Sequence, residues 1–469
     1  MTPMPPTDAM FLIGESRARP MHVGSLQLFQ PPSGAGPDFL PDLYSHALDV
    51  DEIVPLFRKR PRRTWRDAGQ WAWTDDDQFD IEYHVRHSAL PRPGRIRELL
   101  ELCGRLHGTL LDRNRPLWEA HLIEGLNDGR FAMYTKIHHS VLDGVSGLRL
   151  LQQSLSTDAD ERNIPPPWAK PPKASTRKRS DGKSVSPVDI IKRTAGELVG
   201  VAPAVLRTVQ QALNDNRAAL PFQAPHTILN GTITAARRFA AQSWEIERLR
   251  AVGKASGATL NDVVLAMCAG ALRAYLLDLG ALPDEPLIAM VPVSLRKDDS
   301  VGGNSVGTIL CNLATDVADP AARLAAVRSS MLQGKAALEG LSPLQIMALS
   351  ALEMAPMALG PILRSPKFLR PAFNLVISNV PGPRQPLYWN GAALQGIYPL
   401  SIPFDGQALN ITVTSYVDNL EFGLTGCRRS APHLQRLLSH LETSIADLER
   451  VSGVVGSKRR RAKRTAKAS

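Results

Sequence analysis

The feature that most restricts the fold is a proline-rich, basic interruption a little over a third of the way along the chain, at residues 164–183. It holds five prolines and six Lys or Arg against one Asp. Proline removes a backbone donor, and this composition offers little apolar surface, so we expect the segment to bury no core. A chain of 469 residues is also too long for one compact core. The interruption therefore predicts two folded units joined by a linker.

Strand-like and helix-like patterns alternate on both sides of this interruption. Before it, residues 25–29 and 131–137 are typical of strands and 96–111 of a helix. After it, we expect helices at 187–220, 244–256, 260–279, 320–338 and 433–451, and strands at 287–293, 308–313, 373–377, 394–399, 408–416 and 420–426. This alternation predicts a mixed α/β protein. We expect an N-terminal half at 1–160, a linker with a connecting helix at 161–221, a C-terminal half at 222–456 and a basic tail at 457–469.

The net charge of +10 resides mainly in the tail. Seven Lys or Arg and no acid lie within residues 458–469, which leaves +3 for the rest of the chain. A solvated tail with weak attraction to anionic lipid is favoured over nucleic-acid binding, because no basic motif accompanies it. No run of about 20 apolar residues predicts a spanning helix. The nearest approach, 344–363, fits a buried helix or a surface that dips into a membrane interface.

The four cysteines are scattered along the chain, without the paired spacing of a metal site: Cys103, Cys268, Cys311 and Cys427. This pattern predicts buried thiols in a reducing compartment and no bound metal.

Residues 131–150, FAMYTKIHHSVLDGVSGLRL, carry the chemistry. The first seven read as a strand and the last ten as an amphipathic helix, so His138 and His139 fall at the junction, where a side chain can enter a cleft from a rigid backbone. Histidine suits a general base because its usual pKa is about 6.5. Two alternatives remain from the pattern alone. His139 and Asp143 could share a metal across one helical turn, or the two histidines could be ordinary core residues.

The segment HHSVLDG matches the HHxxxDG signature of the acyltransferase superfamily that includes chloramphenicol acetyltransferase and peptide-synthetase condensation domains. More narrowly, the chain resembles the bacterial wax ester synthase/diacylglycerol acyltransferase family along nearly its full length. Further motifs carry this resemblance: DAMFLIGESRARPMHVGSLQLF near the start, the PLW motif that ends at Trp118, the ND motif at Asn261 and Asp262, PVSLR at 292–296 and NVPGP at 379–383.

The resemblance implies an α/β fold of two chloramphenicol-acetyltransferase-like halves packed around a central substrate tunnel. It implies that His139 is the general base and that His138 supports it. By the same resemblance, Asp143 turns away from the tunnel to pair with an arginine, for which Arg296 is our candidate. Gly144 would leave room for substrate beside the base. Trp118, Asn261 and Asp262 fit packing and architecture better than chemistry.

The implied reaction moves a long-chain acyl group from acyl-CoA, as co-substrate, to diacylglycerol, giving triacylglycerol, and to fatty alcohols, giving wax esters. It needs no metal and no bound cofactor. Ser378 with Asn379, or Thr412 with Thr414, could stabilise the oxyanion, and the sequence does not choose between these pairs. Because both substrates are amphiphiles, we expect a cytoplasmic protein held peripherally on the inner face of the plasma membrane or on lipid droplets, without nucleic acid as a partner.

Two other functions fit parts of the pattern. Condensation-type or polyketide-ester transferases also carry HHxxxDG, but they take the acyl group from a carrier protein, and the PLW and ND motifs point away from them. A non-catalytic lipid-binding protein could keep the motif as scaffold, although the base, the aspartate and the glycine are all intact. The preferred acceptor, the acyl chain length and the oligomeric state stay open.

Overall fold

The computed structural model describes residues 1–63, 69–142, 144–170, 223–294, 306–339, 345–346 and 370–454. Asp143 and Arg296 lie outside these residues. So do the helix expected at 187–220, nearly all of the apolar stretch 344–363, and the basic tail.

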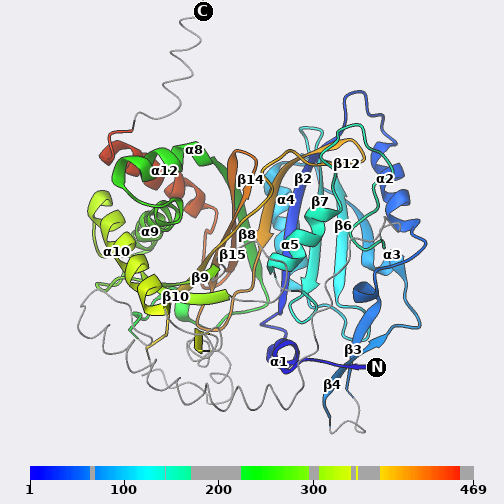
Figure 1. The fold of residues 1–469 in the computed structure, drawn as a ribbon, viewed down its shortest axis with the longest axis horizontal. Coiled ribbons are helices and arrows are strands. Elements are labelled where there is room, and N and C mark those ends of the chain that lie inside the picture. Colours follow the sequence, from blue (N-terminus) through cyan, green and yellow to red (C-terminus); the bar gives the residue numbers. More distant parts are fainter. Residues whose placement is uncertain are drawn as a thin grey trace, which may run out of the picture.

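A six-stranded sheet forms the core of the first half (Figure 1). Its strands, in spatial order, are β12 (Tyr388–Trp389), β13 (Ala392–Leu400), β2 (His22–Gln30), β7 (Phe131–His138), β6 (Trp118–Glu124) and β5 (Val85–Ala89). All neighbours are antiparallel except β5 and β6, which are parallel. Two of the six strands therefore come from the C-terminal part of the chain and complete the sheet at one edge.

A second six-stranded sheet forms the core of the other half. Its order is β10 (Val306–Asn312), β9 (Ile288–Ser294), β11 (Leu375–Val380), β14 (Leu409–Tyr416), β15 (Asn419–Cys427) and β8 (Arg237–Glu245). Four helices cover its outer face: α8 (Ile246–Ser256), α9 (Leu260–Asp278), α10 (Pro320–Leu338) and α12 (Arg436–Val451) (Figure 1). Leucine, valine and alanine side chains of these helices and of alternate strand positions make one continuous core.

Smaller elements complete the first half. A three-stranded sheet orders β1 (Thr2–Pro3), β4 (Trp71–Asp75) and β3 (Lys59–Arg63), with α1 (Pro6–Gly14) nearby at the same edge of the molecule (Figure 1). The remaining helices of this half are α2 (Phe39–Leu48), α3 (Ile81–His84), α4 (Ile96–Gly108) and α5 (Gly144–Gln153), with a 3-10 turn at Pro55–Arg58. Another 3-10 turn, at Ile228–Asn230, belongs to the second half, where Leu229 joins the core.

The two halves meet through α4, which packs on β8, and through β13, which lies against β14 and β15. The approach is very close at Gly423 of β15, where an added Cβ would lie 1.9 Å from the carbonyl oxygen of Pro399 in β13. Only glycine fits at this point. The face of the second sheet that carries Gly423 is therefore its inner face, turned towards the first half.

The predicted mixed α/β architecture of two halves is confirmed, and the strands and helices expected within the described residues appear within about three residues of their predicted ends. The four cysteines are free and buried, as predicted. Among the described residues α9 is long and apolar enough to cross a membrane, but 72% of its most apolar window is buried, as in a core helix.

The expectation that residues 164–183 bury no core is wrong for their first part. Trp168 is 1% exposed, its Nε1 donates to the carbonyl oxygen of Ala47 at 2.9 Å, and its ring stacks on Trp118 at 5.5 Å. Ile164 is buried beside it. One indole anchors the segment because it removes a large apolar area from water whatever the composition around it.

Candidate active site

His139 lies immediately after β7, at the strand-to-helix junction expected from the sequence. Its backbone N–H donates to the carbonyl oxygen of Met21 at 2.8 Å, which extends the pairing of β7 with the segment before β2 by one residue. Its ring stacks on Phe11 of α1, with centroids 4.2 Å apart and planes at 21°. The residue is half-buried. His139 is thus held at both its backbone and its ring while part of it stays accessible.

His138 is fully buried and points to the opposite face of the sheet. Its Nδ1 accepts the backbone N–H of Ser140 at 3.1 Å and lies 2.7 Å from the Ser140 hydroxyl. A ring nitrogen that accepts an N–H carries no proton, so in the neutral ring the proton is on Nε2. That nitrogen faces Glu15 Oε1 at 3.5 Å. The two histidines therefore occupy different environments, one accessible and one enclosed.

Glu15 gathers several donors just after α1. Its Oε1 accepts the N–H of Met21 at 3.2 Å, and its Oε2 accepts Nε and Nη2 of Arg113 at 3.1 and 3.0 Å. The side chain is 2% exposed. Burial acts to raise the pKa of Glu15, but His138, the Met21 N–H and Arg113 outweigh it and lower the pKa below its ordinary value. The carboxyl is therefore an anion beside the histidine pair.

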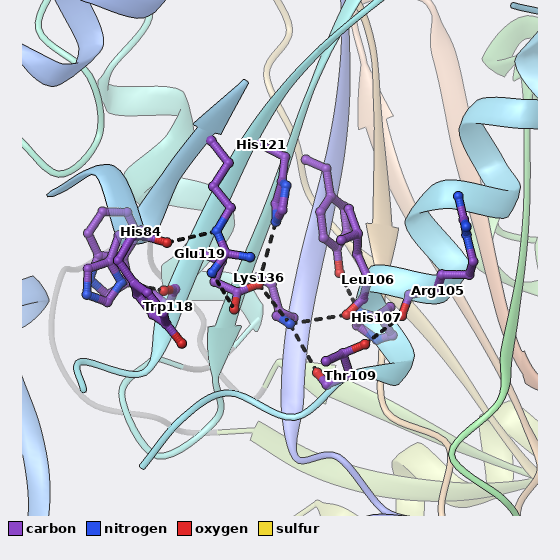
Figure 2. Close-up of polar contacts among 12 residues, drawn as sticks. His84, Arg105, Leu106, His107, Thr109, Trp118, Glu119, His121 and Lys136 are labelled. Atoms are coloured by element: carbon purple, nitrogen blue, oxygen red, sulfur yellow. Dashed lines mark hydrogen bonds and ion pairs between the residues drawn. The ribbon is translucent and has the colours of Figure 1, made fainter. Parts of the chain in front are cut away.

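A second buried charge, that of Lys136, lies two residues before His138 on β7 (Figure 2). The Lys136 ammonium is 3.0 Å from Glu119 Oε2 and donates to the carbonyl oxygens of Leu106 and Thr109, at the end of α4, at 3.1 and 3.0 Å. The three donors of the ammonium thus have three acceptors, two of them at the negative end of the α4 dipole. This contact fixes β7, the strand that His139 follows, to α4.

Burial would raise the pKa of Glu119, yet its charged neighbours lower it to about 2. His121 Nε2 is 3.5 Å from Glu119 Oε2, at the long limit of a hydrogen bond, whereas Lys136 is at 3.0 Å, so we regard Lys136 as the main partner. Burial also lowers the pKa of Lys136, which the attraction of Glu119 only partly offsets. Glu119 is ionised at neutral pH, and the three acceptors around Lys136 Nζ fit its ammonium form, whose burial has a cost.

On the second half, strand pairing sorts the expected oxyanion donors by face. Ser378 pairs with Thr412, and Thr412 with Gly423, so these positions share the inner face. Thr414, two residues on, shares it as well. Asn379 points to the opposite, helix-covered face, where its Nδ2 lies 3.5 Å from Asn261 Oδ1 at the start of α9. The structure therefore separates the expected pair of Ser378 and Asn379.

The inner face also holds an acid that the sequence analysis did not single out. Glu421 is fully buried, hydrogen-bonds to the Ser243 hydroxyl, and through it contacts the Tyr398 hydroxyl, which lies 2.9 Å from that oxygen. Burial raises the pKa of Glu421 to about 7.

The other expected residues have clear surroundings. Trp118 is 2% exposed and donates through Nε1 to the carbonyl oxygen of Phe57 at 2.9 Å. Asp262 caps α9, because its Oδ2 accepts the N–H of Thr259 at 2.9 Å while its own N–H donates to Thr259 Oγ1 at 3.2 Å. Gly144 opens α5, and an added Cβ would meet no described atom within 4 Å.

Four residues that surround the histidine pair were not predicted from the sequence: Phe11, Glu15, Met21 and Arg113. Phe11, Glu15 and Met21 belong to the opening segment that resembles the family, but no local pattern marks their contacts with residues more than 90 positions away. Among the described residues, no cluster of three or more His, Cys, Asp or Glu has the arrangement of a metal site. Asp143, the second ligand of the metal alternative, lies outside the described residues.

Comparison with known proteins identifies relatives over nearly the whole chain. The sequence model of the wax ester synthase/diacylglycerol acyltransferase catalytic domain matches residues 4–264, and that of the WS/DGAT C-terminal domain matches 302–449. A protein of Mycobacterium tuberculosis named as a probable diacylglycerol O-acyltransferase is 54% identical, covering 96% of this chain and 99% of its own. The O-acyltransferase WSD of Acinetobacter baylyi is 47% identical, with coverages of 96% and 98%.

Comparison with solved structures identifies the same family. The wax ester synthase/diacylglycerol acyltransferase from Marinobacter aquaeolei VT8 superposes with a TM-score of 0.78 at 44% identity, covering 97% of this chain and 100% of its own. The first condensation domain of the calcium-dependent antibiotic synthetase superposes with a TM-score of 0.58 at 16% identity, covering 96% of each chain. The second likeness shows a shared fold.

Proposed function

Because this chain belongs to the wax ester synthase/diacylglycerol acyltransferase family, we propose that it transfers a long-chain acyl group from acyl-CoA to diacylglycerol, with fatty alcohols as further acceptors, and that His139 is the general base. The observation that carries the role of His139 is its contrast with His138. Only His139 combines a fixed backbone, a ring held by an apolar neighbour and partial exposure. A base that must meet a substrate hydroxyl needs all three.

In the proposed reaction His139 takes the proton of the acceptor hydroxyl while its oxygen attacks the thioester carbonyl. The tetrahedral oxyanion then collapses, the carbon–sulfur bond breaks, and the imidazolium returns the proton to the CoA thiolate. The thioester is already activated, so no covalent acyl-enzyme and no bound cofactor are needed. The face of Phe11 against the ring favours the positive charge that His139 acquires.

Ser378 is our candidate for the oxyanion donor. It is half-buried on the inner face of the second sheet. The alternatives are weaker: Thr412 Oγ1 donates to Asn410 Oδ1 at 2.8 Å, Thr414 is fully buried, and Asn379 faces the helices. Loss of one such donor costs about 100-fold or more in kcat. Replacing Ser378 by Ala should have this effect with KM little changed, and an unaltered kcat would remove Ser378 from the reaction.

Asp143 and Arg296 keep the roles that the family resemblance implies: an aspartate that orients the motif and an arginine that pairs with it. Gly144 keeps its role of leaving space beside the base, which the open surroundings of its Cα support. We also propose an apolar tunnel between the halves that binds acyl chains, at about 0.8 kcal/mol per buried CH₂, and excludes water as a competing nucleophile.

Replacement of His139 by Ala tests the function directly. With palmitoyl-CoA and dioleoylglycerol, the variant should release CoA at least about 100-fold more slowly than the unaltered protein. Hexadecanol in place of diacylglycerol measures the wax ester activity. His226→Ala is the matched control, since His226 is exposed on the second half. Full turnover by a His139 variant with an unchanged circular dichroism spectrum would refute the assignment.

A carrier protein as acyl donor is the alternative. Competition between acyl-CoA and an acylated carrier protein for the same enzyme separates the two, since our proposal requires acyl-CoA to be the better substrate.

We also propose that the protein binds lipid surfaces peripherally through α1. Met10 and Ile13, three positions apart on that helix, are 58% and 71% exposed, and Phe11 between them contacts His139. Such a face would bring amphiphilic substrates to the base. Met10→Asp combined with Ile13→Asp should reduce sedimentation with phosphatidylglycerol-containing vesicles. Leu332→Asp, at a 56% exposed leucine on α10, is the control. Unchanged sedimentation of the double variant would exclude α1.

A further inference from the structure

We propose that Glu15 is a positioning residue for the acyl transfer: its buried carboxylate orients His138 and, through the peptide of Met21, holds His139. The inference rests on the proposed role of His139 as the base. No residue near Glu15 in sequence predicts it, since Glu15 is 123 positions before His138. The fold alone brings the end of α1 beneath the end of β7.

The connection to His139 runs through a single residue. The N–H of Met21 donates to Glu15 Oε1 at 3.2 Å, and the carbonyl oxygen of Met21 accepts the N–H of His139 at 2.8 Å. Glu15 thus fixes the N–H of Met21, and the carbonyl oxygen of Met21 in turn fixes the backbone of His139. Phe11, which supports the ring of His139, lies one helical turn before Glu15 on α1. One short segment therefore supports both the backbone and the ring of the base.

The connection to His138 concerns which of its ring nitrogens carries the proton. Because His138 Nδ1 accepts the N–H of Ser140, its remaining proton lies on Nε2, which faces Glu15 Oε1 at 3.5 Å. His138 Nε2 makes no hydrogen bond to a described residue, and the carboxylate oxygen that it faces is Glu15 Oε1. A carboxylate behind an imidazole fixes its tautomer and ring orientation. Here the residue that carries this imidazole, His138, directly precedes the proposed base, His139, in the chain.

Arg113 keeps the carboxylate charged. Its guanidinium donates twice to Glu15 Oε2 and once to the carbonyl oxygen of Leu12 at 2.7 Å, so it binds the end of α1 as well as the anion. The Arg113 side chain is 37% exposed, whereas that of Glu15 is enclosed. Without Arg113 the enclosed carboxyl would lose two hydrogen bonds from a guanidinium and would more readily take up a proton.

Glu15→Gln tests the inference, because it keeps the size of the side chain and an acceptor for Met21 but removes the charge. We expect kcat to fall about 10- to 100-fold with KM for palmitoyl-CoA within about threefold, as is typical when a supporting hydrogen-bond partner is lost. Removing a negative charge near the base should also move the acid limb of the pH profile of kcat/KM to lower pH. Glu15→Asp, which restores the charge, should recover the position of that limb.

Two further variants control for stability. Glu449→Gln removes a glutamate of similar burial, paired with Arg248 at 2.9 Å on the outer helices, and should leave kcat and the pH profile unchanged. Arg113→Lys should be more active than Arg113→Met, since only the first keeps a cation beside Glu15. A Glu15→Gln protein with unaltered kcat, or one whose lost activity follows only its lower unfolding temperature while the pH profile stays fixed, would overturn the inference.

The proposed function is tested separately. If His139→Ala is active, the general base itself is wrong. If His139→Ala is inactive and Glu15→Gln behaves as the unaltered protein does, the base stands and only the role of Glu15 fails.

Discussion

Replacing Lys136 by Met should destabilise the first half strongly, because it leaves an anion buried without its main partner. Methionine keeps the length and apolar stem of the side chain and removes only the ammonium. Glu119, with a side chain 7% exposed, would then face Arg86 at 3.6 Å and His121 at 3.5 Å. The carbonyl oxygens of Leu106 and Thr109 would lose their donor as well.

The size of the expected loss in unfolding free energy follows from the pKa of the Glu119 carboxyl. The pKa of Glu119 is about 2 in the folded protein against an ordinary 4.5. This difference corresponds to about 3 kcal/mol of stabilisation at neutral pH, shared among its partners. Breaking one side of a buried ion pair typically costs about 3–5 kcal/mol. We therefore expect Lys136→Met to lower the free energy of unfolding of the first half by about 3 kcal/mol.

The pH dependence has a definite sign. A carboxyl whose folded pKa lies below its unfolded pKa stabilises the fold above the unfolded value, and this stabilisation is lost as the pH falls towards the folded value. The difference between the unaltered protein and Lys136→Met should thus be complete above about pH 4.5 and should shrink towards pH 2.

Guanidinium denaturation followed by tryptophan fluorescence measures the change, since Trp118 adjoins Glu119. Lys170→Met is the matched control: in its surface pair with Glu52 the two side chains are 48% and 66% exposed, so it should cost under about 1 kcal/mol. Glu119→Leu with Lys136→Met should recover much of the loss, because burial already disfavours the charged Lys136. A free energy of unfolding of Lys136→Met within about 1 kcal/mol of that of the unaltered protein would refute the reasoning. A double variant that was less stable than Lys136→Met alone would also refute it.

Two further substitutions probe the contact between the halves. The pKa of Glu421 is about 7, above its ordinary 4.5, so the folded protein keeps a proton that the unfolded chain releases, and stability should fall by about 3 kcal/mol as the pH rises through this window. Glu421→Gln should abolish that fall between pH 5 and pH 8 in thermal unfolding, and an equal fall in the variant would exclude Glu421 as its source. Gly423→Ala should destabilise the protein by more than about 2 kcal/mol, because the new Cβ would meet Pro399 at 1.9 Å. Unfolding temperatures compared with those of Gly36→Ala, whose surroundings are open, would show whether that contact matters.

Most helices and strands could be predicted because their signals are local. The strand-like run at 131–137 and the amphipathic spacing at 433–451 each lie within a single element, so they can be recognised without any knowledge of distant contacts. The same locality placed His138 and His139 at a junction. It could not tell them apart, since their difference in burial comes from Glu15, Phe11 and Met21, which reach them from a distant part of the chain.

Long-range features could not be read from local patterns. The strand expected at 394–399 exists as part of β13, but nothing in its sequence indicates that it joins the sheet of the first half beside β2. Trp168 was missed for a related reason, because the composition of a 20-residue window hides one aromatic anchor. The division of the candidate oxyanion donors between two faces depended on strand register, which one residue of slippage would reverse.

The support of the base depends on both halves, although its residues belong to the first. Residues 15–21, which hold His138 and His139, are tied to the second half where Arg237 donates to the carbonyl oxygen of Ala18 at 2.9 Å and Arg19 pairs with Asp405 at 3.5 Å. The sheet that ends in His139 also takes β13 from the C-terminal part of the chain. A fragment of residues 1–160 would therefore lack both an edge of its sheet and the anchors of the segment beneath its base. The proposed catalysis at His139 therefore requires the assembled chain, because the segment that holds the histidine pair is anchored across the interface through which the halves pack.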